Sequence, residues 1–131
     1  MRRLLGSISM LSAFATAAVV QAAPSEQTFM VRTTGDLADL CSYNSPTDPM
    51  MTASANFCQG YIVGVYHVLT EVEQARTPKP AFCVPNPPPT RNQTIAEFVK
   101  WARASPNDSA LPAADGVFKF FEDRFPCVTK P

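Results

Sequence analysis

The sequence predicts an all-α fold, a small four-helix domain held together by two disulfides. Three observations support this prediction: apolar residues recur at helical spacing, polar or proline-rich stretches separate the helical segments, and the cysteines number four. A core built from about one hundred residues is marginal in size. Two disulfides, worth roughly 2–4 kcal/mol each, would therefore contribute much of the stability.

The N-terminus has the pattern of a cleavable signal peptide, which we assign to residues 1–23. Arg2 and Arg3 precede the uncharged run Leu4–Val20, and small residues follow at the positions that a signal peptidase recognises, so we expect cleavage after Ala22 or Ala23. The run is long enough to be a membrane anchor instead. Its Ser, Thr and Gly content and its small-residue ending favour export, with no membrane attachment after cleavage.

Composition says little about the partner of the exported chain. Without its first two arginines the chain carries nine basic and eleven acidic residues, a net charge near −2. It has neither a basic stripe nor a block of like charge, so we expect no nucleic-acid binding. We place a single helical domain at residues 34–131.

The number and spacing of the cysteines indicate that the protein resides in an oxidising compartment. Sixteen, 24 and 43 residues separate neighbouring cysteines, without a Cys-x-x-Cys pair, and His67 is the only histidine. A zinc site or thioredoxin-like chemistry is therefore disfavoured, and two disulfides are favoured. Cysteine number alone permits three pairings. The cysteines are Cys41, Cys58, Cys83 and Cys127.

Two helices are expected in the first half of the domain. Thr34 and Asp36 are predicted caps of a short helix that reaches Cys41 and stops in the turn-forming cluster at residues 44–46, while residues 24–33 show no pattern. A long helix is predicted over residues 51–76. Its expected core stripe consists of Met51, Ala55, Cys58, Ile62, Val65, Leu69 and Val72.

The motif Gly60, Tyr61, Gly64 lies on a neighbouring face of the long helix. Each glycine costs roughly 1 kcal/mol in a helix interior, so two of them need a reason. We predict a structural role, in which the glycines allow close approach of another backbone. A binding surface is the second interpretation.

A proline-rich connector and two further helices are expected in the second half. Residues 77–89 are predicted to be extended because proline fixes φ and lacks an N–H. Thr90 and Gln93 form a capping box that starts the third helix, whose predicted buried face includes Phe98. For the fourth helix, which ends near Phe125, we predict the core stripe Leu111, Ala114, Val117, Phe118, Phe121 and Phe125, with Phe120 off the stripe and exposed.

We find no pattern typical of an enzyme, a cofactor site or a metal site. His67 lies on the long helix without a free thiol to activate, because the four cysteines are better used as disulfides. Neighbouring acidic pairs such as Glu122 and Asp123 are too close in sequence to share a helix face. Glycine-rich phosphate loops are absent. We therefore predict a binding protein.

An ordered set of short motifs resembles the Rap/Tai family of type VI secretion amidase immunity proteins. These motifs are Leu40-Cys41, the run from Cys58 to Gly64, Phe82-Cys83-Val84-Pro85, Thr90 with Gln93, and Phe125-Pro126-Cys127. The resemblance covers residues 36–127. It departs at His67, where family members often have an acidic residue.

The resemblance implies a periplasmic helical protein that binds a peptidoglycan amidase toxin and blocks its active site. The toxin would be the partner, and a homodimer is left open. By analogy with periplasmic acid-stress chaperones of similar helical shape, Cys41 would pair with Cys83 and Cys58 with Cys127. A chaperone that exposes its phenylalanines in acid is the alternative function.

For the contact with the toxin we predict the segment between the third and fourth helices. It is polar, we expect it to be flexible, and a flexible loop can enter a cleft. The residues chosen are Ser105, Asn107, Asp108, Ser109 and Leu111.

Overall fold

The computed structural model describes residues 23–43, 47–76 and 79–127. Helices make up their regular secondary structure, and the β-structure among them is limited to one antiparallel bridge between Thr33 and Pro112. The all-α prediction is confirmed. Predicted features at residues 1–22, 44–46, 77–78 and 128–131 lie outside the described residues. The elements are the 3-10 helix η1 (Glu26–Phe29), α1 (Thr34–Cys41), α2 (Pro49–His67), the π-helix η2 (Val68–Glu73), α3 (Gln74–Arg76), α4 (Arg91–Ala104), α5 (Pro106–Ser109) and α6 (Ala113–Arg124).

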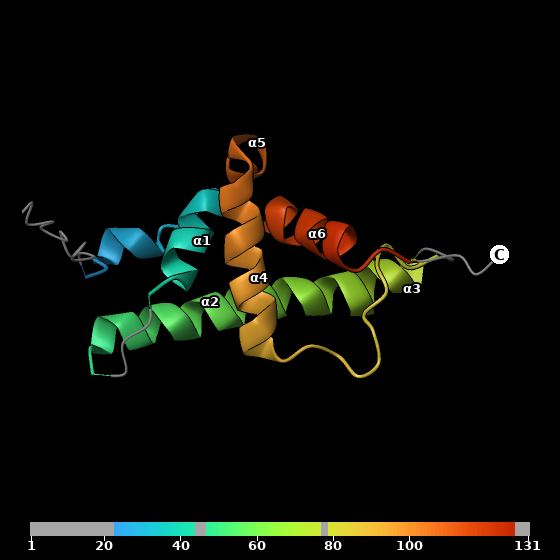
Figure 1. Ribbon diagram of the computed structural model, residues 1–131, viewed down its shortest axis with the longest axis horizontal. Helices are drawn as coiled ribbons and strands as arrows, with labels where there is room; N and C mark the ends of the chain where they lie inside the picture. The colour runs from blue at the N-terminus through green and yellow to red at the C-terminus, as the bar shows by residue number, and fades with distance from the viewer. Residues whose placement is uncertain (1–22, 44–46, 77–78, 128–131) are drawn as a thin grey trace, which may run out of the picture.

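The helices pack around one core above the long helix (Figure 1). Because η2 and α3 continue α2, one helical rod runs from residue 49 to residue 76, which confirms the predicted long helix. Helices α1, α4 and α6 contact one another, and each also contacts α2. Their shared core contains Leu37, Leu40, Phe98, Val117 and Phe120, each at most 1% exposed.

Side-chain caps fix where the first two helices begin. The Thr33 hydroxyl accepts from the Asp36 N–H at 3.1 Å, and the Asp36 carboxylate accepts from the Thr33 N–H at 2.9 Å. Asp36 is therefore a cap as predicted, but its partner is Thr33. Thr34, predicted as a cap, is instead a fully buried residue of the first turn. Asp48 caps α2, and Pro49 fits the first helical position because its missing N–H needs no partner there.

The long helix is buried over only part of its length. Ser54, Cys58 and Ile62 are buried, whereas Val65 and Leu69 are half-buried and Val72 is 40% exposed. The predicted core stripe is thus correct in its middle. It is wrong at Val72, because the helix extends beyond the elements that pack on it.

The buried face of α6 is rotated by about one residue from the predicted stripe. Phe120, predicted to be exposed, is 1% exposed and meets Phe98 edge-to-face at 5.5 Å between ring centroids. Ala114, predicted in the stripe, is exposed. The rotation follows from the close contact of Gly116 with α1, which turns Phe120 toward α4. Buried residues of α6 are Ala113, Gly116, Val117, Phe120 and Phe121.

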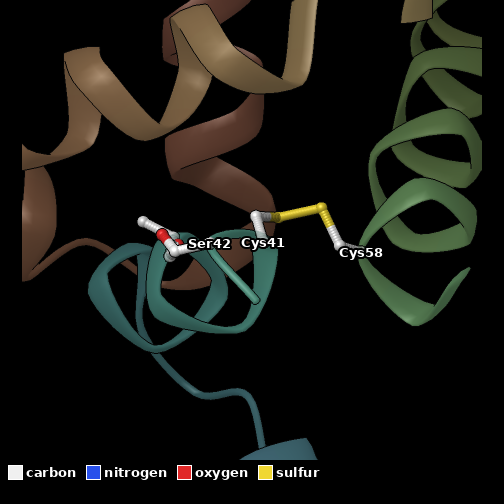
Figure 2. The surroundings of a disulfide bond; sticks show 4 residues. Cys41, Ser42 and Cys58 are labelled. Carbon is white, nitrogen blue, oxygen red and sulfur yellow. Dashed lines mark hydrogen bonds between the residues drawn. A yellow bond between two sulfur atoms is a disulfide. The ribbon is translucent and has the colours of Figure 1, made fainter. Parts of the chain in front are cut away.

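The disulfides pair differently from the expectation. Cys41 bonds to Cys58, with 5.1 Å between Cα atoms, and Cys83 bonds to Cys127, with 4.9 Å between Cα atoms. The predicted pairs Cys41–Cys83 and Cys58–Cys127 are wrong. Figure 2 shows the reason for the first bond: the end of α1 lies directly beside α2. For the second, the Cys83 N–H donates to the Phe125 carbonyl at 2.7 Å, which holds the connector against the C-terminal segment.

Two connecting segments differ in how far they match expectation. Residues 79–89 lack regular secondary structure, as predicted for the proline-rich connector. Residues 24–33, predicted to be without pattern, instead contain η1. Pro24 is buried, and the Phe29 ring lies 5.6 Å from that of Phe57, edge-to-face, so this segment packs on the N-terminal half of α2.

Candidate functional site

The segment predicted to contact a partner forms the single helical turn α5 and its flanks. It lies at the far end of α4, on the side of the molecule away from α2 (Figure 1). Asn107 is exposed, and the other predicted contact residues, Ser105, Asp108, Ser109 and Leu111, are partly buried. The structure therefore places the five residues together at one end of the molecule, with Asn107 outermost in exposure.

The segment expected to be a loop instead contains a helical turn, α5, and it is held by hydrogen bonds. The Ser105 hydroxyl accepts from the Asp108 N–H at 3.3 Å and caps the turn. The Leu111 carbonyl accepts from the N–H of Thr34 at 2.8 Å and from its hydroxyl at 3.1 Å. The Ser105 bond fixes the start of the turn, and the bonds from Thr34 tie the Leu111 end of the segment to α1.

Two glycines that sequence reasoning did not select bring α5 and α6 close to α1. A Cβ at Gly35 would lie 2.5 Å from the Ser109 hydroxyl oxygen, and a Cβ at Gly116 would overlap the Thr34 side chain. At Gly116 a larger residue would have to displace Thr34, whereas at Gly35 the Ser109 hydroxyl would have to rotate away. In the sequence, the signal for such a contact is a single glycine within a helical pattern. That signal does not show which glycine faces a neighbouring helix.

An ion-pair network links α5 to α6. The Lys119 ammonium lies 2.6 Å from the Asp123 carboxylate and 3.7 Å from that of Asp108. The Asp123 carboxylate also accepts from the Trp101 indole N–H at 3.1 Å. The Lys119 hydrogen bond holds the pKa of Asp123 below its usual value. The network orients α5, although exposed pairs of this kind contribute little stability.

The Gly60, Tyr61, Gly64 motif faces open space. A Cβ at either glycine would meet no atom outside its own helix within 4 Å, so the predicted close approach of another backbone within the chain is wrong. A shallow apolar depression lies here, bordered by Val68 and Phe118. Val68 is 53% exposed. The second interpretation, a binding surface, fits this geometry better.

Tyr61 sits between the open face and an aromatic ridge. Its ring stacks on Phe57 at 6.1 Å, and Phe57 in turn meets Phe29. Burial, and to a lesser extent the Asp115 carboxylate, raises the pKa of the Tyr61 hydroxyl. Tyr61 is therefore neutral at physiological pH, and the acidic side chain that borders the depression is Asp115.

His67 lies on the exposed side of the long helix and pairs within one helical turn. Its Nδ1 is 2.7 Å from a Glu71 carboxylate oxygen, and both side chains are more than half exposed. Within residues 23–43, 47–76 and 79–127, histidine, cysteine and acidic side chains form no group of three that could hold a metal ion. All four cysteines are in disulfides.

The described elements define a helical, disulfide-bonded protein. Its two candidate contact surfaces are the α5 turn and the open face of α2 at Gly60 and Gly64. In the described part of the chain, every helix is too short or too polar to cross a bilayer. The family model of the Rap1a immunity proteins matches residues 33–127, and the chain belongs to that family. Membership supports an immunity role and implies binding to a cognate toxin. Comparisons with curated proteins and with solved structures found no significant match.

Proposed function

We propose that this chain is a periplasmic immunity protein that binds and blocks a peptidoglycan amidase delivered by type VI secretion. The observation that carries the proposal is the family match over residues 33–127. The signal-peptide pattern of residues 1–23 and the use of all four cysteines in disulfides are consistent with an oxidising compartment outside the cytoplasm. In this proposal the chain acts by binding, without a catalytic step of its own.

The α5 turn is the surface that we assign to the toxin's cleft. Ordering a flexible loop on binding costs affinity, whereas a turn already fixed in its bound shape does not incur that cost. The anchoring of Leu111 on Thr34 and the cap at Ser105 supply this pre-organisation. Asn107 would then enter the cleft first, because it is exposed while its neighbour Asp108 is held by Lys119.

Calorimetric titration of the exported chain with a peptidoglycan amidase effector of type VI secretion from the same organism tests this assignment. Asn107→Arg places a large charged side chain at the contact, and we expect about 100-fold weaker binding, typical of a disrupted interface centre. Asn56→Arg is the matched control on an exposed position of α2. Wild-type affinity in Asn107→Arg would exclude α5, and absence of binding in the wild-type chain would contradict the proposed partner.

The open α2 face is the surface that we assign to a homodimer. Gly60 and Gly64 carry no side chain that would hold two helices apart, and Val68 and Val72 add exposed apolar area on the same helical rod. The face is apolar along Val65, Val68 and Leu69, with Asp115 at its border, and a two-fold interface presents the same apolar surface from both copies. Gly64→Trp should therefore convert a dimer to a monomer in sedimentation equilibrium; a monomeric wild-type chain would contradict this assignment.

The chaperone alternative requires the fold to open in acid. It depended on a surface formed by Phe118, Phe120, Phe121 and Phe125. Phe120, Phe121 and Phe125 are 1%, 4% and 7% exposed, so the fold must open before they can bind a client. The family match favours the immunity role, so we place that role first.

A further inference from the structure

An apolar cavity lies at the opposite end of α4 from α5. It has a volume of about 250 Å³ and is bounded by the long helix, the proline-rich connector, the first turns of α4 and the end of α6. Its lining includes three buried apolar side chains, Ile62, Phe121 and Phe125. Pro88 and Pro89 form part of one wall. Because proline has no N–H, that wall offers an apolar ligand no unpaired backbone donor.

One cationic side chain borders this apolar cavity. Arg91, the first residue of α4, is exposed and donates to the Gln59 side-chain oxygen at 3.4 Å, a long bond to a neutral group. Among the described residues, no carboxylate lies within ion-pairing distance of Arg91. The arginines Arg103 and Arg124 differ, since each bonds a carboxylate oxygen, on Asp39 and on Glu97 respectively.

The position of Arg91 in its helix adds to the positive potential at the cavity mouth. The N-terminus of an α-helix carries a partial positive charge, which favours an anion near the first turn. Thr90 and Gln93 cap each other here, so the cap itself places no formal negative charge at this end. A ligand with an anionic head and an apolar body would satisfy both the guanidinium and the cavity.

We propose that this cavity binds a medium-chain aliphatic carboxylate of about eight carbons, with its carboxylate on Arg91 and its chain among Ile62, Val84 and Phe121. The chemical class follows from charge and lining: a planar guanidinium pairs with a carboxylate through two parallel hydrogen bonds. The size follows from the volume, which is slightly below the range of pockets that hold drug-sized molecules. This proposal does not depend on the toxin-binding function.

Titration of the ¹⁵N-labelled exported chain with octanoate, followed by amide chemical shifts, tests the proposal. We expect saturable shifts below about 1 mM ligand, confined to residues around Val63, Val84 and Ile95. Octanol, which has the same chain without the charge, should bind about tenfold more weakly, and octylamine more weakly still. Absence of saturation, or shifts confined to another surface, would overturn the proposal.

Two variants test separately the contributions of the Arg91 charge and of the apolar cavity to binding. Arg91→Gln should weaken octanoate binding about tenfold and leave octanol binding unchanged, while Arg103→Gln, which alters an arginine paired with Asp39, should change neither. Val84→Phe should fill the cavity and abolish binding of both ligands, with the fold verified by near-ultraviolet circular dichroism. If Arg91→Gln keeps the preference for octanoate, or Val84→Phe still binds it, the proposed site is wrong.

Discussion

Two pairs of helical glycines in this protein have opposite surroundings. Gly35 and Gly116 lie where α1 meets α5 and α6, and a Cβ at either position would collide with a neighbouring residue. Gly60 and Gly64 lie on the long helix, and a Cβ at either position would meet open space. Spacing four apart made the second pair conspicuous in the sequence. The difference teaches that glycine spacing alone does not distinguish a closed packing contact from an open surface.

The largest loss of stability is expected when a side chain is added at Gly116, in the closed contact. Thr34, which the new Cβ would strike, cannot move away readily, since it is fully buried and its hydroxyl donates to the Leu111 carbonyl. We expect Gly116→Ala to lower the free energy of unfolding by about 3 kcal/mol, as overpacking does in rigid sites. Urea denaturation measures this loss.

A double variant verifies that the Thr34 side chain is the cause. Thr34→Ala makes room for the new methyl group, so Gly116→Ala combined with Thr34→Ala should lose less stability than the two single losses added together. Additive losses would show that the damage at Gly116 arises elsewhere.

A smaller loss is expected at Gly35. Its new Cβ would lie 2.5 Å from the Ser109 hydroxyl oxygen, the end of a side chain that can rotate, and 3.3 Å from the Ser109 carbonyl oxygen. Gly35→Ala should therefore cost about 1 kcal/mol, a moderate overpacking penalty. Adding Ser109→Ala should recover part of that loss; no recovery would contradict the contact.

The closed region should also respond to pH through Asp36. Hydrogen bonds, foremost from the Thr33 N–H, lower the pKa of Asp36 in the folded protein. The lowered pKa means that its stabilisation is present above the unfolded value of about 3.9 and is lost as pH falls through the folded pKa. Asp36→Asn should cost about 1 kcal/mol at pH 7, typical of a lost helix cap.

The same variant supplies the test of the pH dependence. In urea denaturation at decreasing pH, the gap between wild type and Asp36→Asn should narrow below about pH 4, because the wild-type carboxylate becomes protonated. A gap that stays constant down to pH 2 would show that the carboxylate charge is not what stabilises this helix start.

The smallest effect, and one of opposite sign, is expected on the open face. Gly64→Ala meets no neighbouring atom, and alanine is the better helix former. The free energy of unfolding should rise by up to about 1 kcal/mol. If the face pairs with a second copy, self-association should weaken at the same time. A loss of stability in Gly64→Ala at monomeric concentrations would contradict the open geometry.

Much of the fold could be predicted because short local sequence patterns determine where helices begin and where they cannot form. The capping box of Thr90 and Gln93 fixes the start of α4, and both of its side chains make the expected bonds. The prolines of residues 79–89 exclude a helix there. Such signals depend only on neighbours in the chain, which is why a single sequence carries them.

Features that depend on the path of the chain in space could not be predicted. Cysteine spacing permits three pairings, and the observed one follows from the proximity of α1 to α2 and of the connector to residue 127. The burial of Phe120 follows from how tightly α6 approaches α1 at Gly116. The order of the α5 segment follows from its bonds to Thr34, far away in sequence.

The measurement that tests the account most directly is protection of cells that export the proposed amidase partner to the periplasm. Culture density reports lysis while the chain is co-expressed as wild type, Asn107→Arg or Asn56→Arg, at equal levels. We predict that wild type and Asn56→Arg restore growth and that Asn107→Arg does not, because the close contact of Gly35 with Ser109 supports the α5 turn, whose exposed Asn107 we propose enters the toxin. Full protection by Asn107→Arg, or none by the wild-type chain, would contradict this account.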